Sequence, residues 1–361
     1  MRSLPTHRTA YAAALTALAA ALALGACTGS SGGSRTTPPP TPSSTTPSTS
    51  HSATHPPAKP RHRAVNPLRG KGPVPKSPVI AVKIDDTASG RPQLGIDKAD
   101  VVYVEAVEGG LTRLAAIFGT FKPTVGYVRS TRPSDPDLLL QYGKITEAYS
   151  GGAHDSLPRV HRSGITSWSN DDGKPYYSRR PHANDHGYIN LVLNLRAVAN
   201  HVKTPRPKSI GWTFATHTPL LKHARKGTDV RTVVTGSYSH GTPVEFRWNK
   251  GSHRYVRYIN GQRQVAADGK SVSMRNVIVQ SCKVVAHPQD SDVLGNPSQF
   301  TYTVGKGKVS VFRNGKRIDG YWSRNKLKHG TILRTKQGKR IPLMPGNTWV
   351  VLIRKGINVS G

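Results

Sequence analysis

The first 65 residues cannot contribute to a globular core, and this limits what the chain can fold into. Residues 28–65 are mostly Ser, Thr and Pro and contain no Phe, Trp, Tyr, Asp or Glu. Such a segment has too little apolar surface to offset its chain entropy, so we expect it to be disordered and partly polyproline II. About 295 residues follow, which is enough for two domains with their own cores.

A cleavable signal peptide is predicted over residues 1–26 by a basic start and a following run of small apolar residues. The string LGAC that ends at Cys27 matches a lipobox, in which the cysteine receives a diacylglycerol. The alternative is an ordinary secretory signal with a coincidental cysteine. We therefore expect lipid on Cys27 to anchor the protein at the outer, extracytoplasmic face of the cytoplasmic membrane, with residues 27–65 as a tether. No second apolar run is long enough to span a bilayer.

The positive charge is concentrated in the second part of the chain. Residues 66–185 hold 16 basic and 13 acidic side chains, whereas residues 186–361 hold 30 basic and 6 acidic ones. A surface this basic usually has a polyanionic neighbour. Outside the membrane, lipid headgroups, phosphate polymers or wall glycan fit this role better than DNA, so no nucleic acid partner is expected. The alternative is a solvated basic face with no specific ligand.

The first part of the globular region alternates strand-like and helix-like segments, which predicts an N-terminal α/β (α+β) domain with a mixed sheet over residues 66–225. The expected strands are Val79–Ile84, Val101–Val107, Leu114–Phe118, Val125–Val128 and Ile145–Tyr149, and the expected helices are Pro136–Tyr142 and Tyr188–Asn200.

The second part, residues 226–361, has the pattern of a mainly antiparallel β domain. Short apolar runs such as TVVTGSY, KVSVFRN and NTWVVLI are separated by turn dipeptides. Asn-Gly and Asp-Gly between such runs are strong hairpin signals. The dipeptides are Asn260-Gly261, Asp268-Gly269, Asn314-Gly315 and Gln337-Gly338.

Three polar segments of the first domain directly follow apolar runs and predict a binding site. If these strands are parallel, their carboxyl ends share one sheet edge, where ligands bind in open α/β sheets. Arg129 and Arg132 could clamp a carboxylate or phosphate, and the backbone of 150–152 could form an anion-binding nest. The candidate ligand-binding residues are Glu105, Glu108, Arg113, Arg129, Ser130, Arg132, Asp135, Ser150, Gly151, Gly152, His182 and Asn184.

An alternative is that the charged residues in these segments pair with one another and hold loops in place.

The other motifs are weaker evidence for a functional site. His182 and His186 have the i,i+4 spacing of a helical metal site, but Pro181 and Gly187 favour a loop, so no metal and no cofactor are expected. Cys282 is expected at a strand end as a small semi-buried residue.

The same strings resemble the YerB-like family of bacterial lipoproteins. They are VIAVKIDDTASGRPQLGIDKADVVYVEAVEGGLTRLAAIFGTFKPTVGYVRSTRPSD, AYSGGA, RRPHANDHGYIN, NVIVQ, VSVFRNGKRIDGYW and IPLMPGNTWVVLI. The resemblance implies a lipid-anchored protein with a two-part extracytoplasmic domain of unknown function, and it covers residues 66–353. It departs from the family pattern at Asp86, where Asn is more usual, and in the basic second half.

Two hypotheses follow for function. In the first, the protein is an envelope lipoprotein whose first-domain pocket binds an anionic cell-wall component or a partner protein. In the second, it is a hydrolase or transferase of cell-wall polymers that uses Glu105 or Glu108 as general base. An enzyme needs such a carboxylate in an open cleft and unpaired by arginine, which separates the two hypotheses.

Overall fold

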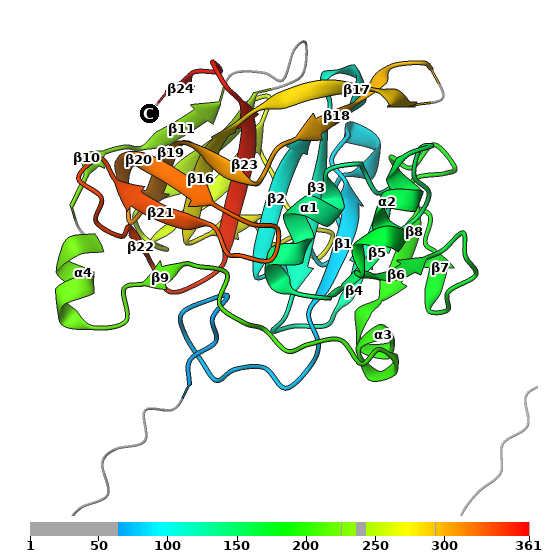
Figure 1. Ribbon diagram of the computed structural model, residues 1–361, viewed down its shortest axis with the longest axis horizontal. Coiled ribbons are helices and arrows are strands. Elements are labelled where there is room, and N and C mark those ends of the chain that lie inside the picture. The colour runs from blue at the N-terminus through cyan, green and yellow to red at the C-terminus, as the bar shows by residue number, and fades with distance from the viewer. Residues whose placement is uncertain (1–63, 225, 236–242, 293, 361) are drawn as a thin grey trace, which may run out of the picture. The chain divides into compact units, whose positions relative to one another are not determined.

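The computed structural model describes residues 64–224, 226–235, 243–292 and 294–360 (Figure 1). The predicted signal peptide 1–26, the predicted lipidation site Cys27 and nearly all of the predicted 27–65 tether lie outside these ranges. So do residues 236–238 of the TVVTGSY run.

One sheet runs through both halves of the chain. Among the described residues it has eleven strands in the order β10-β20-β19-β16-β23-β2-β3-β1-β5-β6, with β21 also paired to β20. The bounds are β1 Ile80–Asp85, β2 Val101–Ala106, β3 Thr112–Phe118, β5 Thr146–Tyr149, β6 Thr166–Ser169, β10 Thr228–Asp229, β16 Asn276–Cys282, β19 Gly305–Arg313, β20 Lys316–Arg324, β21 Ile332–Thr335 and β23 Thr348–Arg354.

The centre of this sheet joins the two halves through β23. This strand is parallel to β2 on one side and to β16 on the other. All six residues of β2 are buried, as are the first six of β23. Strands covered on both faces read as continuous apolar runs, which is why VVYVEA and TWVVLI lack alternation. A single core cluster accordingly includes Val104 from the first half and Val351 from the second.

A second sheet, built from the later part of the chain, has the order β14-β13-β12-β11-β24, with β15 paired to β13. Its strands are β11 Thr232–Thr235, β12 Val244–Asn249, β13 Arg254–Ile259, β14 Gln262–Arg263, β15 Ser273–Met274 and β24 Val359–Ser360. It is tied to the first half by Arg257, whose Nη1 and Nη2 each donate to a different oxygen of Asp86 at 2.7 Å.

The asparagine-glycine hairpins form where the sequence predicts them. Asn260 has φ +50° and joins β13 to β14, and Asn314 has φ +52° and joins β19 to β20. Both residues adopt the positive φ that a tight two-residue hairpin turn requires, which Asn tolerates better than most residues.

The smaller elements cover these sheets. The strands are β4 Thr124–Gly126, β7 Tyr177–Arg179, β8 Leu191–Asn194, β9 Thr213–Phe214, β17 Val284–Ser291, β18 Pro297–Thr301 and β22 Pro342–Leu343. The α-helices are α1 Asp135–Leu139, α2 Ser156–Ser163, α3 Leu195–His201 and α4 Thr218–Ala224. Short 3₁₀ turns are η1 Ala88–Gly90, η2 Ile96–Lys98, η3 Glu108–Gly110 and η4 Leu140–Tyr142.

The predicted helix Tyr188–Asn200 is half wrong. Residues Leu191–Asn194 form β8, which pairs with β4 and β7, and only Leu195–His201 is helical. The apolar residues of this stretch fit either period over so short a distance, and strand pairing decides the outcome. Asn194 then caps α3 by accepting a hydrogen bond from the Ala197 N–H at 3.2 Å.

The chain is thus mostly strands, arranged in mixed and antiparallel sheets with few helices. The predicted mixed sheet of the first part is present, but its helices are short and α1 has only five residues. The first part therefore has less α/β character than the sequence predicts. Strands of both predicted domains share one sheet, and the boundary at residue 225 stays a prediction.

Of the three strands that precede the predicted polar segments, β2 and β5 end on one side of the large sheet, whereas β4 pairs with β8 in a separate sheet. β2 is antiparallel to β3, and β3 is antiparallel to β1, so β2 and β1 run in the same direction. β5 is parallel to β1. The segments that follow these strands therefore emerge on the same side of the sheet. The strand-to-loop segment at Arg129 joins them because its backbone N–H donates to the Lys83 carbonyl at 3.0 Å.

Candidate functional site

A lysine lies at the centre of a buried acidic cluster below this edge. Lys83 on β1 is fully buried, and its Nζ lies 2.7 Å from Asp135 Oδ1 and contacts Glu105 Oε2. Asp135 Oδ2 also accepts from the Arg132 N–H at 2.6 Å. Glu147 on β5 is the third acid, and its Oε1 lies 2.8 Å from the Thr131 hydroxyl. We call Lys83, Glu105, Asp135 and Glu147 the lysine cluster.

The lysine cluster holds a proton that an exposed set of carboxylates would release. Burial, followed by the neighbouring Asp135 carboxylate, raises the pKa of Glu105 to about 8 and places the pKa of Glu147 well above its usual range. Burial alone would lower the pKa of Lys83, but the Asp135 and Glu105 carboxylates raise it. The single hydroxyl hydrogen of Thr131 cannot serve both Asp135 and Glu147, which lie 3.1 and 2.8 Å away. Glu147, whose pKa is raised, can supply the second hydrogen by donating to the Thr131 oxygen.

Glu108 and Arg132 form a second buried unit. Arg132 donates to Glu108 Oε2 from Nε at 3.0 Å and from Nη2 at 2.7 Å. The Ser298 hydroxyl on β18 donates to the other oxygen of Glu108 at 2.5 Å. Burial would raise the pKa of Glu108, but the Arg132 guanidinium and these hydrogen bonds lower it. Of the two arginines expected to clamp an anion, Arg132 is thus paired inside the protein.

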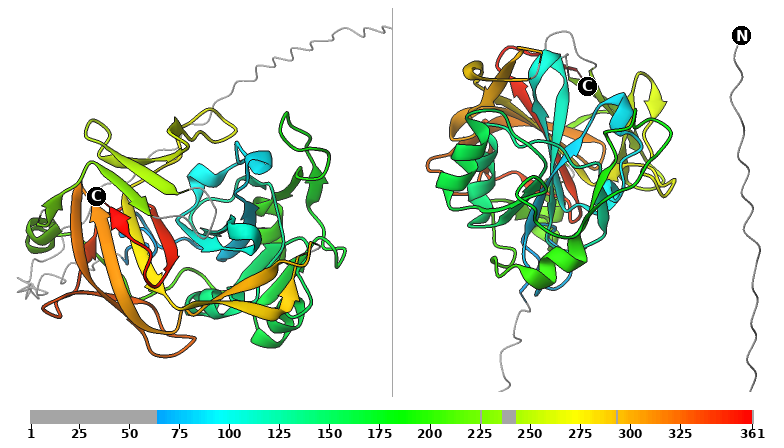
Figure 2. Two further views of the ribbon diagram at one scale, coloured as in Figure 1. Left: turned by 90° about the horizontal axis from the view of Figure 1, so that it is seen from above. Right: turned by 90° about the vertical axis from the view of Figure 1, so that its right-hand side faces the viewer.

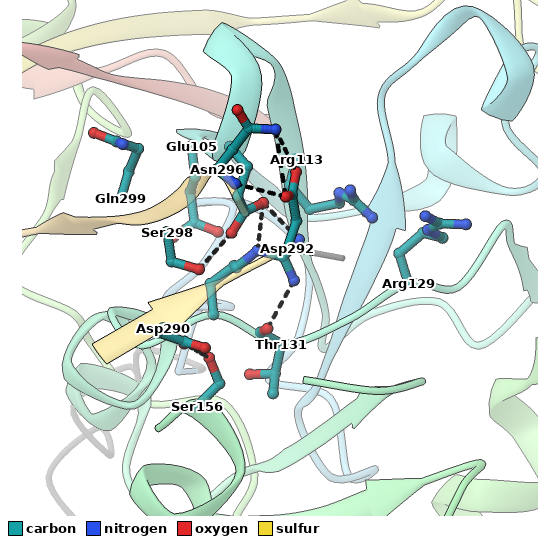
Figure 3. Close-up of polar contacts among 12 residues, drawn as sticks. Glu105, Arg113, Arg129, Thr131, Ser156, Asp290, Asp292, Asn296, Ser298 and Gln299 are labelled. Carbon is teal, nitrogen blue, oxygen red and sulfur yellow. Dashed lines mark hydrogen bonds and ion pairs between the residues drawn. The ribbon is translucent and has the colours of Figure 1, made fainter. Parts of the chain in front are cut away.

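The hairpin β17–β18 covers this unit from the second half of the chain. Besides Ser298, its Asp290 accepts a hydrogen bond from the Ser156 hydroxyl at 2.5 Å (Figure 3). His287 Nε2 lies 3.1 Å from Asp155 Oδ2, and the Arg159 guanidinium lies 5.0 Å from the Phe300 ring centroid. A side of the site predicted from the first domain is therefore built by residues more than a hundred positions later.

Arg113 and Arg129 share one carboxylate and have unused donors. Asp85 Oδ2 lies 3.6 Å from Arg113 Nη1 and 3.4 Å from Arg129 Nε. The other oxygen of Asp85 accepts from the N–H and the hydroxyl of Thr87 at 2.6 and 2.5 Å. Nε and Nη1 of Arg113 are buried and have no hydrogen-bond partner among the described residues. We call Arg113, Arg129 and Asp85 the arginine pair site.

The arginine pair site carries excess positive charge and reaches the surface. Burial first, and then repulsion from Arg132 and Arg129, lowers the pKa of Arg113 to about 10, so the group stays charged at neutral pH. The Arg129 side chain is 29% exposed, and its guanidinium lies 5.8 Å from the ring centroid of Tyr188, which is 61% exposed.

The segment 150–152 lies beside Arg129, but it binds a carboxylate of the chain itself. The Ser150 N–H donates to the Arg129 carbonyl at 3.0 Å, and the Gly151 N–H donates to Asp171 Oδ2. Gly151 has φ +74°, and a Cβ there would lie 3.2 Å from the Ser130 hydroxyl. The donors that the sequence assigns to an external anion at Ser150 and Gly151 are therefore engaged by the protein, whereas ligand binding at Gly152 stays a prediction.

His182 and Asn184 have local partners in a different loop. The His182 ring stacks on Tyr127 with 3.9 Å between centroids, and its Nε2 donates to the Ile189 carbonyl at 2.8 Å. Asn184 donates to the Arg91 carbonyl at 2.8 Å. Within the described ranges neither side chain has a polar contact with Arg129 or Arg132, so their place in the predicted pocket is unsupported.

Neither glutamate fits the role of general base. Both oxygens of Glu108 accept hydrogen bonds, from Arg132 and from Ser298. Glu105 is buried against Lys83. A base must reach a substrate proton directly or through one water, and neither carboxylate faces open space.

Sequence reasoning left several partners out of the site. Lys83 and Asp85 are charged residues within or at the end of the apolar run VIAVKID, and Glu147 lies inside another strand, so an unexpected charge in a buried strand was the available signal. Ser298 lies 190 residues from Glu108, and no local pattern joins the two.

Comparisons with known proteins agree with this architecture. Residues 68–207 match the N-terminal domain, and residues 233–350 the C-terminal domain, of a protein family of unknown function (DUF3048). The candidate lipoprotein YerB of Bacillus subtilis (strain 168) is 28% identical over 293 residues, which cover 76% of this chain and 80% of that protein. The crystal structure of YerB from Bacillus subtilis superposes with a TM-score of 0.67 at 22% identity, over 82% of this chain and 100% of the other.

The two matched segments also fit the arrangement seen here. They contain β2 and the first three residues of β23, the adjacent strands that join the halves of the large sheet. Within the part of the chain that the structure describes, none of the helices has the length and apolar character of a membrane span. In both sequence and fold, the chain belongs to the YerB-like family, whose domain has two parts.

Proposed function

We propose that this chain is a lipid-anchored extracytoplasmic protein that binds an anionic group at the arginine pair site. The observation that carries the proposal is the pair of guanidinium groups on one shared carboxylate oxygen, Asp85 Oδ2, with buried donors of Arg113 unused. Unsatisfied buried donors cost about 1–3 kcal/mol each, more when charged, so an incoming carboxylate or phosphate gains by bonding to them.

The site favours a compact anion at the end of a larger molecule. Arg129 is partly exposed while Arg113 is buried, so an anion that enters past Tyr188 can bridge the two. Arginine forks match the two oxygens of a carboxylate or phosphate, which lysine cannot do. Both an anionic cell-wall component and an acidic side chain of a partner protein offer such a group.

Two substitutions separate ligand binding from structural support. Arg129→Lys keeps the charge but removes the fork, so we expect affinity for the anion to fall about fivefold while the melting temperature changes little. Arg132→Lys breaks a buried bidentate contact with Glu108, so we expect a melting temperature about 3–6 °C lower and unchanged affinity.

The measurement is calorimetric titration of the full-length, detergent-solubilised protein with glycerol 3-phosphate and with N-acetylmuramic acid, alongside thermal unfolding. These probes carry the phosphate and the carboxylate that wall polymers present. Two results would show that the arginine pair site only supports the fold. One is that neither probe binds the wild-type protein at millimolar concentration, and the other is that Arg129→Lys lowers the melting temperature without lowering affinity for the probes.

The lipid anchor is tested by Cys27→Ala. The substitution removes the thiol that would receive the lipid, so we expect the protein to be unprocessed or released from the membrane. Support comes from the lipobox string and from the likeness to a candidate lipoprotein. Membrane retention of a correctly processed Cys27→Ala protein would contradict the anchor.

A further inference from the structure

A broad groove lies on the outer part of the large sheet, at the opposite end of the strand order from the lysine cluster. Its volume is about 1260 Å³, and it is formed mainly by β16, β19, β20, β21 and the segment 353–359. In Figure 2, β19, β20 and β21 are among the orange and red strands on one side of the molecule, and β16 is the yellow strand beside them. We call this the basic groove.

The pairing register shows which side chains line the basic groove together. On β19, Lys306 faces Ser323 and Lys308 faces Tyr321 of β20, and Tyr321 in turn faces Arg334 of β21. Residues opposite one another in a sheet have Cβ atoms about 5 Å apart and share one face. Lys308, Tyr321 and Arg334 therefore form a row across three strands, with an aromatic ring between two cations.

The side chains of this row face solvent while their strand neighbours face the core. Lys306, Lys308 and Arg334 are exposed, and Tyr321 is 51% exposed. The alternating residues Val309, Trp322 and Leu333 are buried. The cations are thus on the open face of the sheet, and they do not depend on burial for their position.

The basic groove has no matching acids among the residues described. Its lining includes seven cationic side chains and a single acid, Asp319. That acid is occupied, because Arg317 Nε donates to it at 2.9 Å and the Ser310 hydroxyl at 2.6 Å. The cations are Lys283, Lys306, Lys308, Arg317, Arg334, Lys336 and Lys355.

We propose that the basic groove binds a linear polyanion, a chain of polyol or sugar units joined by phosphodiester links. Lysines predominate, and an ammonium on a flexible stem acts as a point charge that suits repeated phosphates more than one oriented anion. Tyr321 offers an amphipathic ring against which an uncharged unit between two phosphates can lie. This ligand class goes beyond the compact anion proposed for the arginine pair site, and the two sites have no lining residue in common.

The test is binding of poly(glycerol phosphate) to the full-length, detergent-solubilised protein at several salt concentrations. We expect Lys306→Gln/Lys308→Gln to bind about tenfold more weakly at about 50 mM salt, and to flatten the slope of log affinity against log salt by about one to two. The matched control is Lys250→Gln/Arg263→Gln, which removes the same charge from an exposed turn after β12 and from the exposed strand β14. We expect the control to change affinity by less than about twofold.

Tyr321→Ala tests the aromatic part of the row. Because no charge is removed, we expect affinity to fall about threefold to fivefold with an unchanged salt slope. An equal loss of affinity in the groove variant and the control variant would overturn the proposal, since net charge alone would then explain binding. So would equal binding of neutral dextran, or binding to phosphatidylglycerol vesicles with none to the polymer. A thermal unfolding scan of each variant confirms that the fold is retained.

Discussion

The lysine cluster and the basic groove lie toward opposite ends of one sheet, and they differ in whether their charges are buried and paired or exposed. At the first, the one cation, Lys83, is buried and lies within reach of the carboxylates of Glu105 and Asp135. At the second, seven cations line an open surface with one acid, which is already bonded. The first arrangement contributes to folding because its charges cannot be separated without loss. The second can meet a ligand because cations such as Lys306 and Lys308 are exposed.

The largest expected effect comes from removing the central cation of the lysine cluster. Lys83→Met leaves buried carboxyls without a positive partner, so we expect the free energy of unfolding to fall by about 3–5 kcal/mol. Denaturant unfolding of the full-length protein measures this, and Lys76→Met, at an exposed lysine, is the control. A loss of less than about 1 kcal/mol for Lys83→Met would show that the cluster is not held together by its charges.

The protonation of the cluster predicts a pH dependence of stability. The pKa of Glu105 is about 8 in the folded protein, whereas an unfolded glutamate titrates near 4.3. Between these values the folded state binds more protons, so the free energy of unfolding falls as pH rises, by up to about 1.4 kcal/mol per pH unit. We expect Glu105→Gln to reduce this loss of stability with rising pH. The control is Glu245→Gln, at a partly exposed glutamate that pairs with Arg247, and it should leave the pH dependence unchanged. Parallel wild-type and Glu105→Gln curves between about pH 5 and 8 would contradict the raised pKa.

The contact between the hairpin β17–β18 and Glu108 should have an intermediate effect. Ser298→Ala leaves one buried oxygen of Glu108 without its donor, so we expect a loss of about 1–2 kcal/mol in unfolding free energy. Ser252→Ala, at an exposed turn, should stay within about 0.5 kcal/mol of wild type. If the two serine variants are equally stable, the hairpin does not depend on this bond.

The smallest effect on folding is expected at the basic groove. Lys306→Gln/Lys308→Gln should change the unfolding free energy by less than about 0.5 kcal/mol, because both side chains are exposed and neither has an ion-pair partner among the described residues. Thermal unfolding of the variant already made for polymer binding provides the measurement. If the unfolding free energy falls as much as it does in Ser298→Ala, the charges of the basic groove also stabilise the fold.

The sequence predicted features that are decided locally and missed those decided by distant partners. The hairpins at Asn260 and Asn314 follow from a φ that asparagine and glycine tolerate, so two residues suffice. The strand ends that gather near Glu105 also follow from apolar runs. By contrast, Leu191–Asn194 became a strand because β4 and β7 pair with it, which no pattern within those residues records.

The same distinction explains what was missed at the candidate site. Arg129 and Arg132 have the same residue type and lie three positions apart, yet Glu108 engages one and Asp85 the other. The Glu108 carboxylate that engages Arg132 also accepts from Ser298, on a hairpin from the other half of the chain. The sequence therefore predicted which residue types gather at the site. It did not predict which of those charged side chains are paired within the protein.

The position of β23 has a consequence for how the protein is made. Of the strands in the large sheet, β23 comes last in the chain, yet it lies between β16 and β2. A chain that emerges from the ribosome N-terminus first therefore has β2 ready long before its neighbour exists, and that open edge can pair with other chains. Parallel pairing between residues so far apart is also slow. Completion of the sheet must follow translation, and a holding chaperone that shields β2 until Thr348–Arg354 is available would raise the yield of folded protein.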